Sequence, residues 1–210
     1  MPEIILFVTL VSTYLMVIAK RMSSLILAFR CQSFFLFLIT LIAGFTEKHV
    51  DLYFVAFLIL ALKVFIIPHF LYLTAKRINL DENLGLFVNS QLSLITALVL
   101  TFFSWIFSRR IVLSQDYALV AITVSFSIVF IGAFLMISRV KALSQVIGLL
   151  VMENGIFLLA SSISGGMPFF VEIAVFFDVF VSVIVMGLFV YRINKLFTHI
   201  DVSKLSQLKG

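Results

Sequence analysis

Charged and amide side chains interrupt several long apolar runs of the sequence. Lys63, Glu153 and Asp178 lie near the centres of three such runs. Gln32 lies midway along a fourth, and Glu172 lies nearer the outer end of the run that holds Asp178. Apolar surroundings favour the neutral forms of such groups, so groups of this kind can exchange protons near neutral pH. The pattern predicts a proton pathway through these five residues.

A purely structural role is the alternative for the same charges. Lys63 and Asp178 are of opposite sign, and a buried ion pair between them would fix helix packing without moving protons. The presence of three central charges together with Gln32 favours the proton pathway, and both interpretations remain open.

Other reactive side chains give weaker signals. Arg30 lies about two turns inside its run and is expected to extend toward the lipid headgroups. His69 follows Pro68, which is expected to kink its helix, and Cys31 has no second thiol with which to pair. The three histidines are too scattered for a metal site, and no nucleotide-binding, haem-attachment or nucleophile motif is present. We therefore expect no catalytic residue, metal site or cofactor-binding residue in this chain.

The composition determines the class of protein. Hydrophobic residues make up 63% of the 210 residues, charged residues only 12%, and there are 25 phenylalanines. A soluble domain has about 25% charged residues, and a chain this apolar cannot cover its surface with polar groups. The composition excludes soluble enzymes, nucleic-acid-binding proteins and secreted disulfide scaffolds. It predicts one integral membrane domain over residues 1–210.

Long apolar runs predict the elements that position these charges. A membrane-spanning helix needs about 20 apolar residues, and the runs do not show the polar alternation of barrel strands. An all-α polytopic fold with about seven transmembrane helices is expected, over residues 4–19, 24–45, 52–75, 84–107, 117–138, 142–163 and 169–191.

The basic residues between these runs predict the orientation. With the N-terminus outside, only three would lie on the outer side: Lys48, Arg109 and Arg110. Ten would lie on the inner side: Lys20, Arg21, Lys76, Arg77, Arg139, Lys141, Arg192, Lys195, Lys204 and Lys209. Such an excess marks the cytoplasmic side. It predicts an N-terminus outside the membrane and a cytoplasmic C-terminal tail over residues 194–210.

Two halves of the sequence resemble each other. At an offset of 121, Gln32 aligns with Glu153, and after a six-residue change of offset Lys63 aligns with Asp178. Two units of three helices that run in the same directions require an odd linker helix, and parallel repeats occur in transport proteins. The sequence thus predicts a parallel 3+1+3 tandem repeat, with units at 1–78 and 117–193 and a linker helix at 84–107.

Several motifs resemble membrane subunits of respiratory complexes. Residues 146–154 (VIGLLVMEN) and 172–192 are similar to the second and third helices of subunit K of complex I. The whole chain resembles component E of hydrogenase-4, a longer relative of subunit K. That resemblance rests on five segments: 28–33 (AFRCQS), 63–68 (KVFIIP), 152–155 (MENG), 201–205 (DVSKL) and 208–210 (LKG).

The resemblance implies a membrane subunit of a proton-pumping, complex I-like or formate hydrogenlyase-type assembly. Its partners would be antiporter-like and other membrane subunits in a bacterial or archaeal cell membrane. Such a subunit carries no cofactor and is not itself catalytic. Asp178 stands at the position of the second membrane glutamate of subunit K. Leu150 stands at that of the first, with Glu153 one helical turn later on the same face.

Two alternatives to the hydrogenase assembly stay open at this point. One is a subunit of an ion-transport or inorganic-carbon-uptake complex that uses the same membrane parts without a hydrogenase. The other is a structural spacer that seats larger antiporter-like subunits. The sequence does not separate them, because any redox chemistry would lie on other chains.

Overall fold

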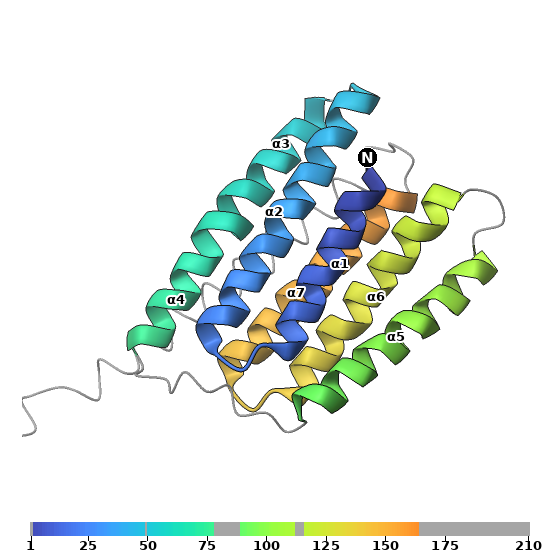
Figure 1. Cartoon of the computed structure of the whole chain (residues 1–210). Helices are drawn as coiled ribbons and strands as arrows, with labels where there is room; N and C mark the ends of the chain where they lie inside the picture. Colours follow the sequence, from blue (N-terminus) through green and yellow to red (C-terminus); the bar gives the residue numbers. More distant parts are fainter. Residues whose placement is uncertain (1, 49, 78–88, 112–115, 164–210) are drawn as a thin grey trace, which may run out of the picture.

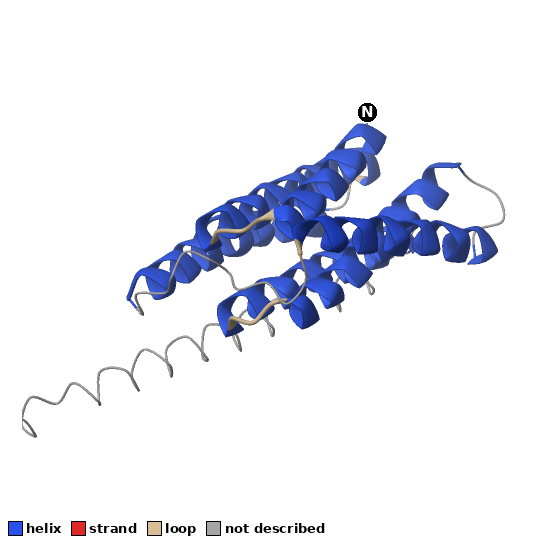
Figure 2. Ribbon diagram, turned by 60° about the horizontal axis from the view of Figure 1, so that its bottom comes forward, coloured by secondary structure: helices blue, strands red, loops and turns tan. Residues whose placement is uncertain are grey.

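The computed structural model describes residues 2–48, 50–77, 89–111 and 116–163 of the 210-residue chain. The predicted seventh helix at 169–191, with Glu172 and Asp178, lies outside the described residues, as does the tail at 194–210. Within the described ranges every regular element is a helix and there is no strand, as Figure 2 shows.

The described helices follow the first six apolar runs. They are α1 (Pro2–Ile18), α2 (Met22–Glu47), α3 (Val50–Leu58), η1 (Ile59–Ile66), α4 (Ile67–Arg77), α5 (Ser90–Ile111), α6 (Asp116–Ser138) and α7 (Ala142–Ile163). The elements α3, η1 and α4 follow one another without a break and form a single long rod. A helix satisfies every backbone polar group inside its own segment, which is what an apolar run needs in lipid.

The helices pack side by side with their axes roughly aligned (Figure 1). Helices α1 and α6 run in one direction, and α2 and α7 run in the opposite direction. The turn between α1 and α2, the end of α4 and the turn between α6 and α7 lie at one end of the bundle. Equivalent helices of the two predicted repeat units thus share a direction. Because the third helix of the second unit lies outside the described residues, the repeat stays a prediction.

The outer surface of the bundle is apolar. Large apolar side chains are exposed along α1 at Ile4, Phe7, Val11 and Leu15, at the spacing of one helix face. Among the described residues, five helices are long and apolar enough to cross a membrane, and α1 is a shorter apolar helix. A surface of this kind is stable in lipid rather than in water. The described helices are those of a membrane protein, and the total of seven remains a prediction.

Glycines bring α6 and α7 unusually close together. A Cβ atom built on Gly132 of α6 would lie 2.5 Å from the Met152 nitrogen of α7. One built on Gly148 of α7 would lie 2.7 Å from the Met136 nitrogen of α6. Small residues at a membrane helix interface allow backbones to approach and gain dispersion contacts. This contact fixes α7, which carries Glu153, against its neighbour.

The rod that carries Lys63 contains a π-helical segment. Pro68 has no N–H group, so it cannot donate to a carbonyl in the preceding turn. The eight residues of η1 precede it, and the Ile67 N–H donates to the Leu62 carbonyl, five residues back. We expected a proline kink here, and the structure shows a widened turn beside the proline. Such π segments occur often at functional sites.

Helix α5 continues to Ile111, past residue 107 where the predicted linker helix ends, and holds Arg109 and Arg110 in its last turn. These two cations are exposed and complement the partial negative charge of a helix C-terminus.

Arg139 lies between α6 and α7, as the apolar runs predict, and its side chain is buried. Its guanidinium donates to the carbonyls of Met16, Val17 and Ala19, at 2.8, 3.0 and 3.0 Å, and so caps the end of α1. Burial lowers the pKa of Arg139 to about 10, which leaves it protonated at neutral pH. The cap ties the turn between α6 and α7 to α1.

Candidate functional site

The centre of the bundle holds a buried cation on the π segment. Lys63 lies in η1, and its side chain is completely buried. Its Nζ atom donates to Asn154 Oδ1 at 2.7 Å. An ammonium group away from water needs such polar partners, because an isolated buried charge is strongly unfavourable.

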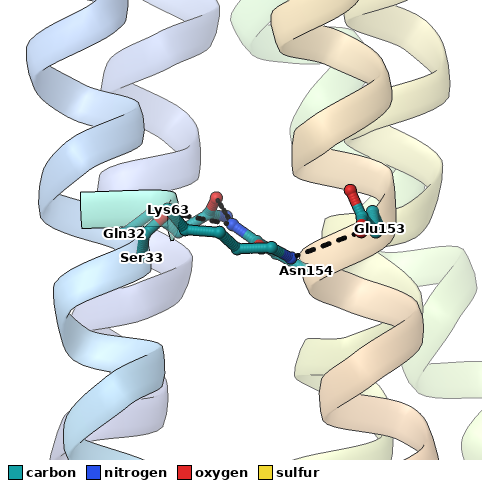
Figure 3. A network of polar contacts seen from close by, with 5 residues as sticks. All are labelled: Gln32, Ser33, Lys63, Glu153 and Asn154. Carbon is teal, nitrogen blue, oxygen red and sulfur yellow. Dashed lines mark hydrogen bonds and ion pairs between the residues drawn. The ribbon is translucent and has the colours of Figure 1, made fainter. Parts of the chain in front are cut away.

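A carboxylate on α7 faces the same cation. Glu153 Oε1 lies 3.7 Å from Lys63 Nζ, and the Glu153 side chain is only 2% exposed. Figure 3 shows the Lys63 side chain crossing from η1 toward Glu153 and Asn154 on α7. The two groups of opposite sign therefore form a buried ion pair between two helices that are distant in sequence.

Amide side chains extend this pair into a hydrogen-bonded chain across the bundle. Asn154 Nδ2 donates to Gln32 Oε1 on α2 at 3.0 Å, and more weakly to Ser33 Oγ at 3.4 Å. Gln32 Nε2 donates to Thr13 Oγ1 on α1 at 2.8 Å. Thr13 Oγ1 in turn donates to the Thr9 carbonyl at 3.0 Å. All these donors point the same way, from η1 toward α1.

The whole chain of contacts is shielded from the surroundings. Gln32, Ser33 and Thr13 are each fully buried, and Asn154 is 1% exposed. A buried polar network of this kind has well-defined geometry, because each group that loses its partner costs about 1–3 kcal/mol. We call the six residues Thr13, Gln32, Ser33, Lys63, Glu153 and Asn154 the polar cluster.

The members of the polar cluster differ in the chemistry they offer. Lysine and glutamate gain and lose a proton, whereas the amides of Gln32 and Asn154 only donate and accept hydrogen bonds. Lys63 and Glu153 are therefore the members of the polar cluster that could exchange protons, and the amide of Asn154 accepts a hydrogen bond from the lysine. Gln32, predicted as a member of the pathway, joins the polar cluster through its hydrogen bonds with Asn154 and Thr13.

Three of the five predicted pathway residues lie in the polar cluster. Lys63, Glu153 and Gln32 were predicted to act together, and the structure brings them together. The predicted partners Asp178 and Glu172 lie outside the described residues, so a Lys63–Asp178 pair stays a prediction.

Asn154, Ser33 and Thr13 were not predicted as site residues. One sequence signal pointed to two of them: the offset of 121 that aligns Gln32 with Glu153 also aligns Ser33 with Asn154. These aligned positions lie opposite each other on α2 and α7, where Asn154 contacts both Gln32 and Ser33. Nothing in the sequence distinguishes Thr13 from the other threonines of the apolar helices. It belongs to the polar cluster only because helix packing places it beside Gln32.

The weaker candidates lie away from the polar cluster. Arg30 is exposed, with its guanidinium carbon 5.4 Å from the centroid of the Phe65 ring. His69 is exposed beside Phe70, and Cys31 is exposed on α2. In the described part of the chain, no group of three or more histidine, cysteine or acidic residues is placed to hold a metal ion.

Comparison with known proteins gives one relative of interest. The uncharacterized protein Rv0085 of Mycobacterium tuberculosis (strain ATCC 25618 / H37Rv) is 29% identical to the chain over 176 residues. The similarity covers 81% of this chain and 79% of the relative. No model of a known protein family matches the chain, and no solved structure matches it. Because the relative is uncharacterized, the similarity assigns no function to this chain.

Proposed function

We propose that this protein is a membrane subunit of a complex I-like or hydrogenase-4-type assembly and that it contributes to proton translocation. The observation that carries the proposal is the buried pair of Lys63 and Glu153, whose charged atoms lie 3.7 Å apart, with the Asn154 amide oxygen accepting from the lysine. Ionisable residues inside membrane helices are unfavourable and mark ion or proton pathways by default. The resemblance of the MENG and KVFIIP segments to component E supplies the type of assembly.

The main residues of the polar cluster have distinct roles in this proposal. Glu153 accepts a proton, Lys63 releases its own proton to the next group of the path, and Glu153 then reprotonates the neutral lysine, so the charge of each group depends on that of the other. Asn154 accepts from the ammonium and donates to Gln32, so it holds the lysine at a fixed place between the helices. Thr13 anchors the far end of the amide chain on α1. The π turn around Lys63 is the backbone element that presents the lysine to α7.

The neighbouring steps of the path belong to other residues. Asp178 and Glu172 are the sequence-based candidates for the next acidic positions, and antiporter-like subunits would continue the path. A complex for ion transport or inorganic-carbon uptake would use the same residues in the same way. Iron–sulfur and nickel–iron subunits that co-purify with the chain in mild detergent would favour the hydrogenase-4 type, and antiporter-like subunits without them would favour the other complex.

A set of substitutions at the ion pair tests proton transfer against a packing role. Glu153→Gln keeps the volume and hydrogen bonding but cannot ionise. In the assembled complex, it should abolish or strongly reduce proton pumping into inverted membrane vesicles while leaving the amount of complex nearly unchanged. Lys63→Met should act in the same direction. Lys63→Arg should not restore pumping, because arginine does not release its proton.

A packing role predicts a different pattern for the same variants. Either single neutralisation would then leave a buried charge, at a cost of about 3–5 kcal/mol, and would reduce the yield of complex. The double change Lys63→Met with Glu153→Gln would recover both yield and pumping, and that result would sink the proton pathway at this pair. Asp51→Asn is the matched control, because it makes the same chemical change at an exposed residue in the first turn of α3.

A further inference from the structure

A groove lies on the outer surface between α2 and the η1–α4 part of the rod. Its volume is about 670 Å³, and Ile26 and Leu27 of α2 line one wall while Phe65 and Ile66 line the other. Leu27 and Phe65 are exposed, so the apolar walls open to the surroundings. The groove lies outside the polar cluster and shares no residue with it.

A single arginine supplies the charge of this groove. Arg30 lines it, is exposed, and is held over the Phe65 ring at 5.4 Å. His69 is also in the lining, and none of the lining residues is acidic. An arginine resting on an aromatic ring keeps its outward-facing N–H donors available for a planar, bidentate contact with an anion.

Basic residues also flank the part of the groove that is nearer the end of the bundle. Ser23, in the first turn of α2, and Tyr72 of α4 line this part. Lys20 lies just before α2, Lys76 lies one turn beyond Tyr72, and both are exposed. Arg30 is seven residues along α2 from Ser23, or about 10 Å deeper at 1.5 Å per residue. Basic residues thus lie both at the end of the bundle and about 10 Å deeper at Arg30, and the apolar residues Ile26 and Leu27 line the groove between them.

We propose that this groove binds one anionic phospholipid. Lys20 and Lys76 attract the negative charge of the headgroup at the end of the bundle, the Arg30 side chain extends from deeper in the groove toward the headgroup phosphate, and one acyl chain lies along Leu27 and Phe65. Basic pockets between membrane helices bind anionic headgroups in this way. The long arginine side chain reaches from its apolar position to the headgroup level.

Native mass spectrometry of the full chain in mild detergent tests the proposal, with phosphatidylglycerol and phosphatidylcholine of identical acyl chains as probes. The wild type should bind one phosphatidylglycerol at least about tenfold more tightly than phosphatidylcholine. Arg30→Gln should weaken phosphatidylglycerol binding by about tenfold or more, as expected for a lost charged hydrogen bond. Arg30→Lys should weaken it less, because the charge remains.

Two further variants separate this site from general attraction to a basic protein. Arg109 also rests on an aromatic ring, 4.3 Å from the Trp105 centroid, but is not part of the groove lining. Arg109→Gln should therefore leave binding unchanged. Leu27→Trp fills the groove without changing any charge and should weaken binding as much as Arg30→Gln does. Equal binding of the two lipids, unchanged binding in Arg30→Gln, or an equal loss in Arg109→Gln would overturn the proposal.

Discussion

Helix α7 presents glycines to α6 on one side and a carboxylate and an amide to α2 and η1 on the other. On the glycine side the backbones approach so closely that Gly148 has no room for a side chain, and the attraction is dispersion between well-packed atoms. On the polar side Glu153 and Asn154 are held by hydrogen bonds and an ion pair. Both sides are buried, yet only the polar side contains groups that titrate.

The two sides differ in what a change of residue does. A close-packed apolar contact fails when atoms are added, because a backbone cannot move away cheaply. A buried polar network fails when atoms are removed, because the remaining groups lose their partners. If the glycines hold α7 in place, the fold does not depend on the buried ion pair of the polar side. That pair could then be retained for function even though burying its charges is unfavourable. That separation of roles can be tested by substitution on each side.

The largest effect is expected on the glycine side. A Cβ atom at Gly132 would lie 2.5 Å from the Met152 nitrogen, so Gly132→Ala must push α6 and α7 apart. We expect a loss of about 3 kcal/mol or more, since overpacking costs about 1–3 kcal/mol even where side chains can adjust. The fraction of monodisperse protein left after heating in detergent, followed by size exclusion, measures it.

Gly44→Ala is the matched control for this prediction. A Cβ atom there would lie 3.4 Å from the Leu52 Cβ, which is ordinary contact, so the variant should be at least as stable as the wild type. Equal tolerance of the two alanines would contradict the close approach of α6 and α7.

The second effect is expected at the centre of the polar side. Asn154→Leu removes the acceptor for Lys63 and the donor for Gln32 while roughly keeping the volume. We expect a loss of about 2 kcal/mol, measured by the same heating assay, together with a large loss of proton pumping.

Gln145→Leu provides the comparison on the same helix. Gln145 is partly buried in the first turn of α7 and donates to the Arg139 carbonyl, away from the polar cluster. It should lower stability modestly and leave pumping intact. Loss of pumping in both variants would show that pumping follows stability rather than the cluster.

The smallest effect is expected at the far end of the amide chain. Thr13→Val removes the hydroxyl that accepts from Gln32, and we expect a loss of about 1 kcal/mol. Pumping should fall only partly, because Lys63 and Glu153 remain. Thr46→Val removes a hydroxyl that bonds only to carbonyls of its own helix at an exposed position, and it should be close to neutral. A Thr13→Val variant indistinguishable from Thr46→Val would remove Thr13 from the polar cluster.

The sequence by itself determined the helical membrane class and most of the described helices. Apolar runs of about 20 residues form helices in lipid, because a helix pairs each backbone polar group within its own segment. The sequence also picked out Lys63, Glu153 and Gln32, since polar residues are rare at mid-helix and therefore conspicuous.

Only the tertiary structure decided which of these groups meet and which partners complete them. Asn154 and Thr13 join the site through contacts between helices far apart in the chain, and no periodicity along one helix encodes such a contact. The same is true of Arg139, which reads as a loop charge and yet caps α1. Helix formation depends on neighbours in the sequence, whereas burial and hydrogen-bond partners depend on how separate helices pack. The contacts between these residues are therefore visible only in the folded bundle.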